Sequence, residues 1–425
     1  MRVLWLCNIM LPVIAKQLGK EVNNKEGWLS GTYNRLKEAN FCHETGEKLE
    51  LGICFPVPKE EDGLEVSTDG LKAFGFFEDT ENPEKYDVGL EERLKKIIEK
   101  FKPDLVHCFG TEYPHTLAVT RAFPYPDKIL VGIQGLCFKY AEVYMANLPE
   151  KIQKRATFRD VLKQDSILSQ YKKFVKRGGY EIEALENVNH VTGRTRWDRE
   201  SVREVSAANY HFMNETLRGE FYEGDWDIKT CEEHSIFMSQ GNYPIKGLHF
   251  MLEAMPVILK KFPKTRLYVA GNDVTKYKTL KEKIKISGYG KYLRELISKY
   301  NLEDKVCFLG SLNAGEMKAR FLKSNLYVCP SAIENSPNSL GEAMILGVPA
   351  IAADTGGISS IFTDEQDGLL FENGNVKELT EKIVYMFSNT DKMLKFAQNA
   401  KAHAKNTHNP DENYRRLLEI YREIV

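Results

Sequence analysis

Long apolar runs, paired cysteines and net charge are what this sequence lacks. No stretch comes near the roughly 18 consecutive apolar residues of a membrane-spanning helix, and the apolar run at 2–7 is too short for a signal peptide. A formal net charge of −1 over 425 residues argues against a general nucleic-acid binder. We therefore expect a cytoplasmic globular protein that binds no nucleic acid.

The cysteines show neither metal-binding nor disulfide spacing. None belongs to a CxxC pair, and several lie within apolar, strand-like runs, so we expect reduced core thiols. Asp225-Trp226-Asp227 matches the DxD pattern that elsewhere holds a divalent metal, but it lies in a stretch without regular periodicity. We expect no metal site. The eight cysteines are Cys7, Cys42, Cys54, Cys108, Cys137, Cys231, Cys307 and Cys329.

The length predicts at least two domains, and the pattern predicts an α/β fold for each. Apolar runs alternate with helical periodicity in both halves, which is typical of doubly wound, Rossmann-like parallel sheets facing a central cleft. We place an acceptor-side domain at 1–215, a donor-side domain at 216–408, and a C-terminal helix at 409–425 that packs back on the first domain.

The expected elements of the first domain place several polar residues at strand ends. Strands are expected at 3–7, 49–57, 105–108, 129–133 and, as the last strand, 188–191, with a hairpin at 63–77 and helices at 32–39 and 90–101. Because ligands bind beyond the carboxyl ends of parallel strands, His107, Glu112 and His115 are candidate cleft residues. A buried His107 and a helix-start Glu112 are the structural alternatives.

Two further groups in the first domain have a functional and a structural interpretation. Gly27 and Gly31 either let a ligand approach the backbone or form an ordinary turn. Arg194 and Arg196, which follow the last expected strand, either bind an anion or stabilise the domain.

Residues 151–177 form a strongly basic segment, with nine Lys or Arg and two Asp. Phe158, Val161 and Leu162 begin an apolar series at helical spacing, which predicts a basic amphipathic helix. Such a helix either contacts anionic lipid as a peripheral membrane element or packs on its own domain with a solvated basic face.

In the second domain, strands and helices alternate in the same way. Strands are expected at 235–238, 265–270, 305–309, 326–329, 349–352 and 369–371, with helices at 247–262, 277–300, 314–323 and 376–387. The loop after the first strand, 239–247, opens a helix, so a diphosphate could lie on its backbone N–H groups with Lys246 as counter-charge. The glycines of Asp354-Thr355-Gly356-Gly357 have two equally good interpretations: close approach of the backbone to a ligand, or a special turn.

The most informative stretch is 330–344, which reads as strand end, loop and helix start. Ser336 suits the N-cap and Pro337 the first helical position, and Glu342 is expected to face away from the core side. Glu334 precedes the helix, so two carboxylates would lie near one positive helix terminus. That arrangement suits a polyhydroxylated ligand carrying phosphate.

These motifs together resemble the retaining glycosyltransferases of family 4, which have the GT-B fold. The motifs are Glu334-x7-Glu342, Cys329-Pro330-Ser331, Gly347-Val348-Pro349 and Asp354-Thr355-Gly356-Gly357. Asn8-Ile9-Met10-Leu11-Pro12, with Gly27-Trp28-Leu29 and 192–198, looks like members that build bacterial surface polysaccharides.

The resemblance implies metal-independent transfer of a sugar from a UDP- or GDP-sugar, with no cofactor, to a glycan or lipid-linked acceptor. It assigns catalysis to Glu334 and His115. Donor binding falls to Glu342 at the ribose, Lys246 at the diphosphate, and Gly241, Asn242, Asn338, Ser339 and Leu340 around the sugar and phosphates.

One departure concerns an arginine that family members usually place a few residues before the lysine. Here the position falls on Gly241 or its neighbours Gln240 and Asn242, and Arg194 or Arg196 is a candidate substitute. Glu26 also stands where a second glycine is common. Two alternatives therefore remain: a non-catalytic sugar-nucleotide-binding subunit, and a nucleotide-sugar epimerase or phosphorylase on the same scaffold.

Overall fold

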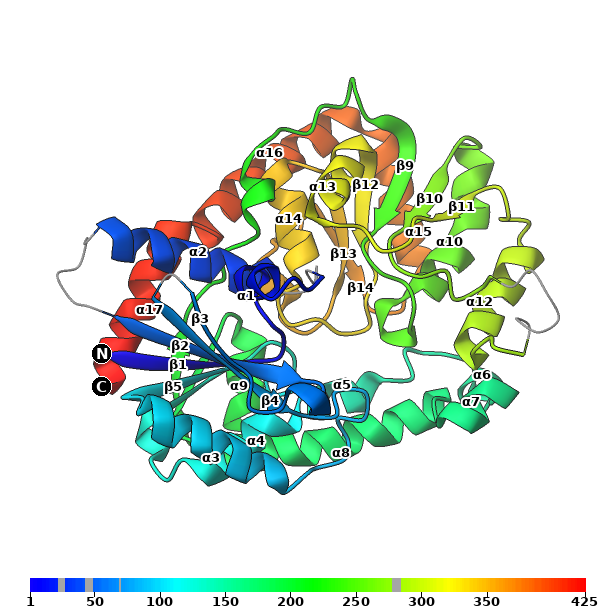
Figure 1. Ribbon diagram of the computed structural model, residues 1–425. Coiled ribbons are helices and arrows are strands. Elements are labelled where there is room, and N and C mark those ends of the chain that lie inside the picture. Colours follow the sequence, from blue (N-terminus) through cyan, green and yellow to red (C-terminus); the bar gives the residue numbers. More distant parts are fainter. Residues whose placement is uncertain (22–26, 43–48, 69, 277–283) are drawn as a thin grey trace. The chain divides into compact units, whose positions relative to one another are not determined.

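A computed structural model describes residues 1–21, 27–42, 49–68, 70–276 and 284–425 as two compact units (Figure 1). Unit 1 comprises Met1–Ala141, Lys173–Arg218 and His408–Val425, and unit 2 comprises Glu142–Lys172 and Gly219–Thr407. The C-terminal segment thus groups with unit 1. The predicted range 1–215 was wrong for Glu142–Lys172, which groups with unit 2. Side chains of this segment form hydrogen bonds and an ion pair with residues 286–295 of that unit.

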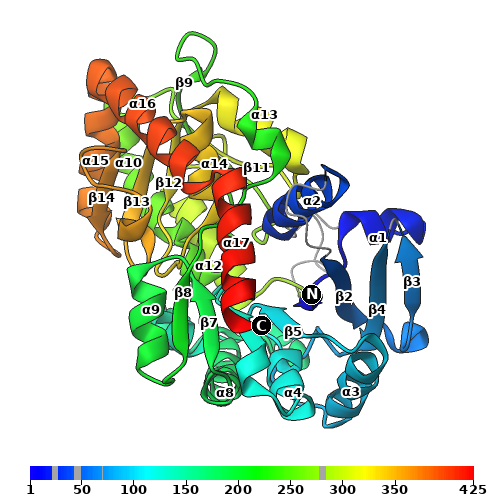
Figure 2. The ribbon, with the colours of Figure 1, turned by 90° about the vertical axis from the view of Figure 1, so that its left-hand side faces the viewer.

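Unit 1 contains an eight-stranded sheet in the order β3-β4-β2-β1-β5-β6-β7-β8, parallel except for the β3–β4 pair (Figure 2). The strands are β1 (Arg2–Cys7), β2 (Glu50–Val57), β3 (Glu65–Thr68), β4 (Leu71–Phe77), β5 (Leu105–Phe109), β6 (Ile129–Gly132), β7 (His190–Gly193) and β8 (Asn209–Phe212). The expected hairpin is confirmed as β3–β4. The prediction that the chain's first sheet ends at 188–191 was wrong, because the edge strand β8 has no buried residue and hence no apolar alternation.

Helices cover both faces of this sheet, which explains its nearly continuous apolar strands. Side chains of β1 alternate between two cores: Val3, Trp5 and Cys7 pack in one, and Leu4 and Leu6 in the other. The first core includes helices α1 (Pro12–Gln17), α2 (Gly27–Cys42) and α17 (Pro410–Ile424), and the second includes α3 (Gly89–Phe101), α4 (Pro114–Ala122), α8 (Ile167–Glu186) and α9 (Arg196–Arg203).

Unit 2 contains a six-stranded parallel sheet in the order β11-β10-β9-β12-β13-β14. Its strands are β9 (Glu232–Met238), β10 (Arg266–Val269), β11 (Val306–Phe308), β12 (Ser324–Cys329), β13 (Ala350–Asp354) and β14 (Leu369–Glu372). Its helices include α10 (Leu248–Lys261), α12 (Gly288–Lys299), α13 (Ala314–Lys323), α14 (Asn338–Leu346), α15 (Val376–Ser388) and α16 (Thr390–Thr407).

Each sheet has one switch point, where successive strands begin to be added in the opposite direction. It lies between β1 and β5 in unit 1 and between β9 and β12 in unit 2. Loops that leave neighbouring strands there diverge to opposite faces of the sheet and open a crevice for ligands. The switch points therefore determine where candidate site residues gather.

Two predicted helices have other bounds in the structure, and in each case a side chain caps the start of a helix inside the predicted range. Within the predicted helix 277–300, residues 284–287 are not helical, Ser287 accepts a bond from Gly290 N, and α12 starts at Gly288; residues 277–283 lie outside the described residues. The basic segment 151–177 was predicted as one helix but contains α6 (Glu150–Gln153), α7 (Phe158–Lys163) and the start of α8. Thr157 caps α7, and Gln164 ends it with φ of 49°.

Among the described residues, none of the helices is both long enough and apolar enough to cross a bilayer. Seven cysteines are free thiols there, of which Cys307 is exposed and Cys231 half-buried rather than in the core as expected.

We predict that Tyr421→Phe destabilises unit 1 by about 1–3 kcal/mol. The buried Tyr421 hydroxyl accepts a bond from Trp5 Nε1 at 2.9 Å and lies 2.7 Å from His107 Nδ1, so its loss leaves two buried polar atoms without a partner. Urea unfolding should show a lower midpoint with an unchanged slope. Tyr385→Phe, which alters a tyrosine that is 39% exposed, is the control; equal midpoints for the two variants would contradict the prediction.

Candidate functional site

Two loops pack against each other at the switch point of unit 2, after β9 and after β12. Ala332 N donates to Ile245 O at 2.6 Å. Gly247 has φ of 71°, and a Cβ there would lie 1.9 Å from Pro330 O. Only glycine permits this approach, so the two loops are held backbone to backbone.

An ion pair joins these loops. Lys246 Nζ lies 2.5 Å from Glu334 Oε1, and the side chains are 18% and 10% exposed. The Lys246 ammonium also lies 5.8 Å from the centre of the Tyr243 ring. The structure therefore brings together the two residues that the sequence assigned to the diphosphate and the sugar.

The backbone of Glu334 is fixed by the loop after β13. Gly357 N donates to Glu334 O at 2.9 Å, and Gly356 has φ of 55°, where a Cβ would lie 2.0 Å from that oxygen. Of the two interpretations of Asp354-Thr355-Gly356-Gly357, the special turn accounts for Gly356. Its freedom lets the backbone approach Glu334 rather than a ligand.

Asn373, which follows β14, was not identified from the sequence. Its Nδ2 donates to Ala332 O at 2.7 Å, and Thr355 Oγ1 donates to the same oxygen at 2.9 Å. The Oδ1 atom of Asn373 is buried and has no hydrogen-bond partner. Its position at a strand's carboxyl end was the only signal available.

The start of α14 differs from the prediction. Its N-cap is Pro337, which has ψ of 114° and no capping side chain, rather than Ser336. Because proline has no side-chain acceptor, the first-turn N–H groups lack a side-chain cap at the helix's positive end. Asn338 Oδ1, beside this turn, is buried without a partner. The turn is therefore suited to a phosphate or a sugar hydroxyl.

Tyr327 of β12 connects the loop after β9 with the first turn of α14. Its hydroxyl donates to Ser339 Oγ at 2.8 Å and lies 3.0 Å from Ser239 Oγ. Burial raises the pKa of Tyr327, so the phenol stays neutral. Burial and the Glu334 carboxylate likewise raise the pKa of the Cys329 thiol to about 11, which excludes it as a thiolate nucleophile at neutral pH.

Glu342 is more enclosed than its helical position predicted. It was expected to face away from the core, but it is 3% exposed, and Leu340 to Leu346 are all buried. The reason is that α13, α16 and the short helix η3 (Gly219–Tyr222) also pack on α14. Its assignment to the ribose stays a prediction.

Gly241 packs closely against the Leu248 and Val269 side chains. A Cβ there would lie 2.8 Å from Leu248 Cδ2 and 2.9 Å from Val269 Cγ1. A larger residue at this position would have to displace both side chains, whereas the neighbouring Asn242 is exposed.

In unit 1, the switch point brings Asn8, Glu112 and His115 together. His115 Nε2 lies 3.0 Å from Asn8 Oδ1, and Asn8 Nδ2 donates to Glu112 Oε2 at 3.3 Å. The other imidazole nitrogen lies 2.6 Å from Oε2 of Glu78, a residue that the sequence analysis missed although it directly follows β4. His115 is fully buried, so its direct contact with substrate stays a prediction.

Glu112 is held by Gly135 and Arg177, and a second carboxyl group, that of Glu181, is buried nearby in unit 1. Glu112 Oε1 accepts from Gly135 N at 3.1 Å, and its carbonyl oxygen accepts from Arg177 Nη2 at 2.8 Å. Glu181 accepts from Phe138 N at 3.0 Å and from Thr111, and burial raises its pKa to about 8. Glu181 is therefore mainly protonated at neutral pH.

His107 and the two arginines have structural partners within unit 1. His107 is buried against Tyr421, and burial lowers its pKa to about 3. Arg194 is ion-paired with Glu215, and Arg196 Nε lies 2.6 Å from Glu200 Oε1. Arg194 is 5% exposed, whereas Arg196 is 78% exposed, so an anion contact of Arg196 stays a prediction.

The remaining candidates lie in a helix or have partners near the surface. Gly27 and Gly31 lie in α2 rather than in a loop, and a Cβ on Gly31 would lie 2.5 Å from Leu217 O, so this glycine serves helix packing. Asp225 pairs with Lys401, and Asp227 Oδ1 accepts from Lys229 N at 2.9 Å. In the described part of the chain, no three His, Cys, Asp or Glu residues are grouped for a metal ion.

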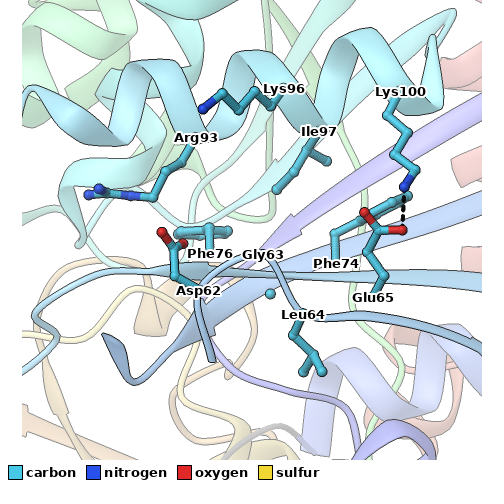
Figure 3. Close-up of a pocket in the computed structure, with 11 residues that line it drawn as sticks. Asp62, Gly63, Leu64, Glu65, Phe74, Phe76, Arg93, Lys96, Ile97 and Lys100 are labelled. Atoms are coloured by element: carbon cyan, nitrogen blue, oxygen red, sulfur yellow. Dashed lines mark hydrogen bonds and ion pairs between the residues drawn. The ribbon is translucent and has the colours of Figure 1, made fainter. Parts of the chain in front are cut away.

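Unit 1 also contains a cavity of about 270 Å³ between α3 and the β3–β4 hairpin (Figure 3). Phe74, Phe76 and Ile97 line it, with Lys96 and other charged side chains around them. The Phe76 ring, which lines the cavity, also lies 5.6 Å from the His115 ring.

Comparisons with known proteins agree with this geometry. Residues 223–403 match the model of the family described as glycosyl transferases group 1. A putative glycosyltransferase of Bacillus subtilis, YtcC, is 23% identical over 76% of this chain and 73% of its own length. Three relatives at 22–26% identity, YtcC among them, are matched over 49%, 73% and 32% of their lengths.

Solved structures match over nearly the whole chain. Sucrose-phosphate synthase from Thermosynechococcus elongatus has a TM-score of 0.71 at 15% identity, covering 100% of this chain and 99% of its own. Anabaena HepE in complex with UDP-glucose has a TM-score of 0.64 at 13% identity, covering 100% of both chains. The chain thus has the GT-B fold, and the Lys246–Glu334 pair lies within residues 223–403, the part that matches the model of glycosyl transferases group 1.

Proposed function

We propose that this protein is a retaining, metal-independent glycosyltransferase that moves a sugar from a nucleotide-diphosphate sugar to a glycan or lipid-linked acceptor. The observation that carries the proposal is the Lys246–Glu334 pair, set beside the uncapped start of α14 at a sheet switch point. A cation and backbone N–H groups suit a diphosphate, and a carboxylate beside them suits the sugar. The bound UDP-glucose of HepE, a protein of the same fold, supports this class of donor.

In the proposed reaction, Lys246 exchanges its ion-pair partner Glu334 for the diphosphate of the donor. A bound diphosphate can replace Glu334 as the counter-ion of Lys246, so no charge is left buried without a partner. The released carboxylate then stabilises positive charge that develops on the sugar as the C1–oxygen bond breaks and its electrons leave with the diphosphate. The acceptor oxygen bonds to C1 on the same face, and its proton passes to the departing phosphate.

The acceptor and the place of action are further parts of the proposal. The likeness of the sequence to enzymes of capsule, O-antigen or exopolysaccharide synthesis favours bacterial polysaccharide assembly. The free thiols of the described residues suit the cytoplasm. The basic segment 151–177 favours peripheral contact with the inner face of the membrane, where a lipid-linked acceptor would lie.

We predict different kinetic effects for the two members of the pair. Lys246→Ala should weaken donor binding about 10–100-fold, because it removes a charge-assisted contact to the diphosphate. Glu334→Gln should lower kcat by about a hundredfold or more with a smaller effect on donor Kd, because its charge acts mainly in the transition state. Calorimetric donor titration and initial rates separate the two parameters.

Lys377→Ala provides a matched control, because it removes an exposed lysine of the same unit that is ion-paired with Glu381. Its binding and turnover should equal those of the wild type. Unchanged rates in both site variants would contradict the proposal. Conversion of labelled nucleotide sugar without any acceptor would indicate an epimerase, and binding without transfer to any acceptor would indicate a non-catalytic subunit.

We also predict that transfer persists in excess EDTA and keeps the anomeric configuration of the donor. Lys246 and the start of α14 provide the positive charge that the leaving diphosphate needs. Proton NMR of the product identifies the anomer directly. Activity that EDTA abolishes and Mg²⁺ or Mn²⁺ restores would overturn metal independence, and an inverted anomer would overturn retention.

A further inference from the structure

Helix α7 exposes its large apolar side chains and buries an aspartate, the reverse of what a helix on a protein surface normally does. Phe158, Val161 and Leu162 are 64%, 67% and 69% exposed, whereas Asp160 is 1% exposed. A helix on the surface of a soluble protein normally buries its apolar side chains against the core and exposes its charged ones to water. Clustered exposure of large apolar groups within six residues therefore marks a surface that something else covers.

The inward side of α7 is anchored by hydrogen bonds, so the helix cannot simply rotate to hide these side chains. Asp160 Oδ2 accepts from Thr157 N at 3.0 Å and from Gly288 N, at the start of α12, at 2.8 Å. Thr157 Oγ1 donates to Ile286 O at 2.8 Å, and Arg155 Nη1 lies 2.8 Å from Glu295 Oε2. Figure 1 shows α6 and α7 beside α12, in agreement with these bonds.

The charges around the exposed apolar side chains are mainly positive and only partly neutralised. Arg155 and Arg159 have acidic partners, and Lys154 pairs with Glu150. Lys151, Lys163 and Lys172 have no ion-pair partner among the described residues, and all three are exposed. Leu168, at the start of α8, adds a further apolar side chain that is 37% exposed.

From this arrangement we propose that α7 is a membrane wedge: Phe158, Val161 and Leu162 insert into the interface of an anionic bilayer while Lys151, Lys163 and Lys172 contact lipid phosphates. Helices that lie in the membrane interface combine Phe and Leu with flanking lysines in this way. The inference rests on the proposed function for its purpose, since a lipid-linked acceptor would lie in the same interface. The proposed membrane contact is thus made by α7 and its flanking lysines, rather than by one continuous helix over 151–177 as the sequence predicted.

Charge argues against the other occupants of this surface. A second copy of the chain in a two-fold interface would bring the same lysines face to face, which is repulsive. Lysine is also depleted in protein–protein interfaces, whereas it is favoured next to anionic lipid. A bilayer satisfies both the apolar and the cationic parts of the surface.

The test is sedimentation of the full chain with vesicles of phosphatidylcholine alone or with added phosphatidylglycerol. The wild type should bind the anionic vesicles and dissociate as salt is raised. Leu162→Ser combined with Phe158→Ser should weaken binding by about tenfold or more. Lys163→Gln should weaken it by about fivefold. Val88→Ser removes an equally exposed valine of unit 1 and should bind as the wild type does.

Equal binding of the wild type and the double serine variant would overturn the proposal, as would equal binding to neutral and anionic vesicles. A wild-type dimer in size-exclusion chromatography that the serine variant converts to a monomer would assign the surface to a second copy instead.

Donor titration without vesicles keeps this inference separate from the proposed function. The double serine variant should bind the nucleotide sugar as the wild type does, because none of the residues assigned to the donor lies in α7. Vesicle binding without any donor binding would refute the glycosyltransferase proposal and leave the wedge standing, whereas donor binding without vesicle binding would do the reverse.

Discussion

The Lys246–Glu334 ion pair is the interaction on which the candidate site depends. Both side chains are largely withdrawn from water, and removing one partner of such a pair typically costs about 3–5 kcal/mol. The surrounding chain is shaped to hold it: Gly247 and Gly356 let two loops approach the β12 loop, and Asn373 and Thr355 fix the Ala332 carbonyl. A ligand that supplies its own negative charge can exchange with Glu334 at little cost in paired charge.

The two sheets place chemistry at corresponding positions by the same topological rule. In each unit the candidate residues gather where successive strands diverge, after β1 and β5 or after β9 and β12. The two clusters nevertheless differ in character. The Lys246 and Glu334 side chains keep 18% and 10% of their surface exposed, whereas His115 is fully buried between Asn8 and Glu78. The cluster of unit 2 is therefore the one to which we assign the donor, and that of unit 1 resembles a structural network.

Much of the fold and part of the site could be predicted from local patterns. Buried parallel strands are continuous apolar runs, so most strands were found, and Lys246 and Glu334 follow from motif spacing. Contacts distant in sequence could not be found: Asn373, after β14, donates to Ala332, after β12, and α16 packs on α14, the helix that carries Glu342. Likewise, the Thr157–Asp160 cap splits the basic segment and turns the expected packing face of α7 outward.

The central claim is that a donor diphosphate binds between Lys246 and the first turn of α14. A crystal structure with a non-hydrolysable nucleotide-diphosphate sugar tests it most directly. The account predicts a phosphate oxygen within hydrogen-bonding distance of Lys246 Nζ, with Glu334 turned from the lysine toward the sugar. A donor bound elsewhere, with the ion pair between Lys246 and Glu334 unbroken, would contradict it.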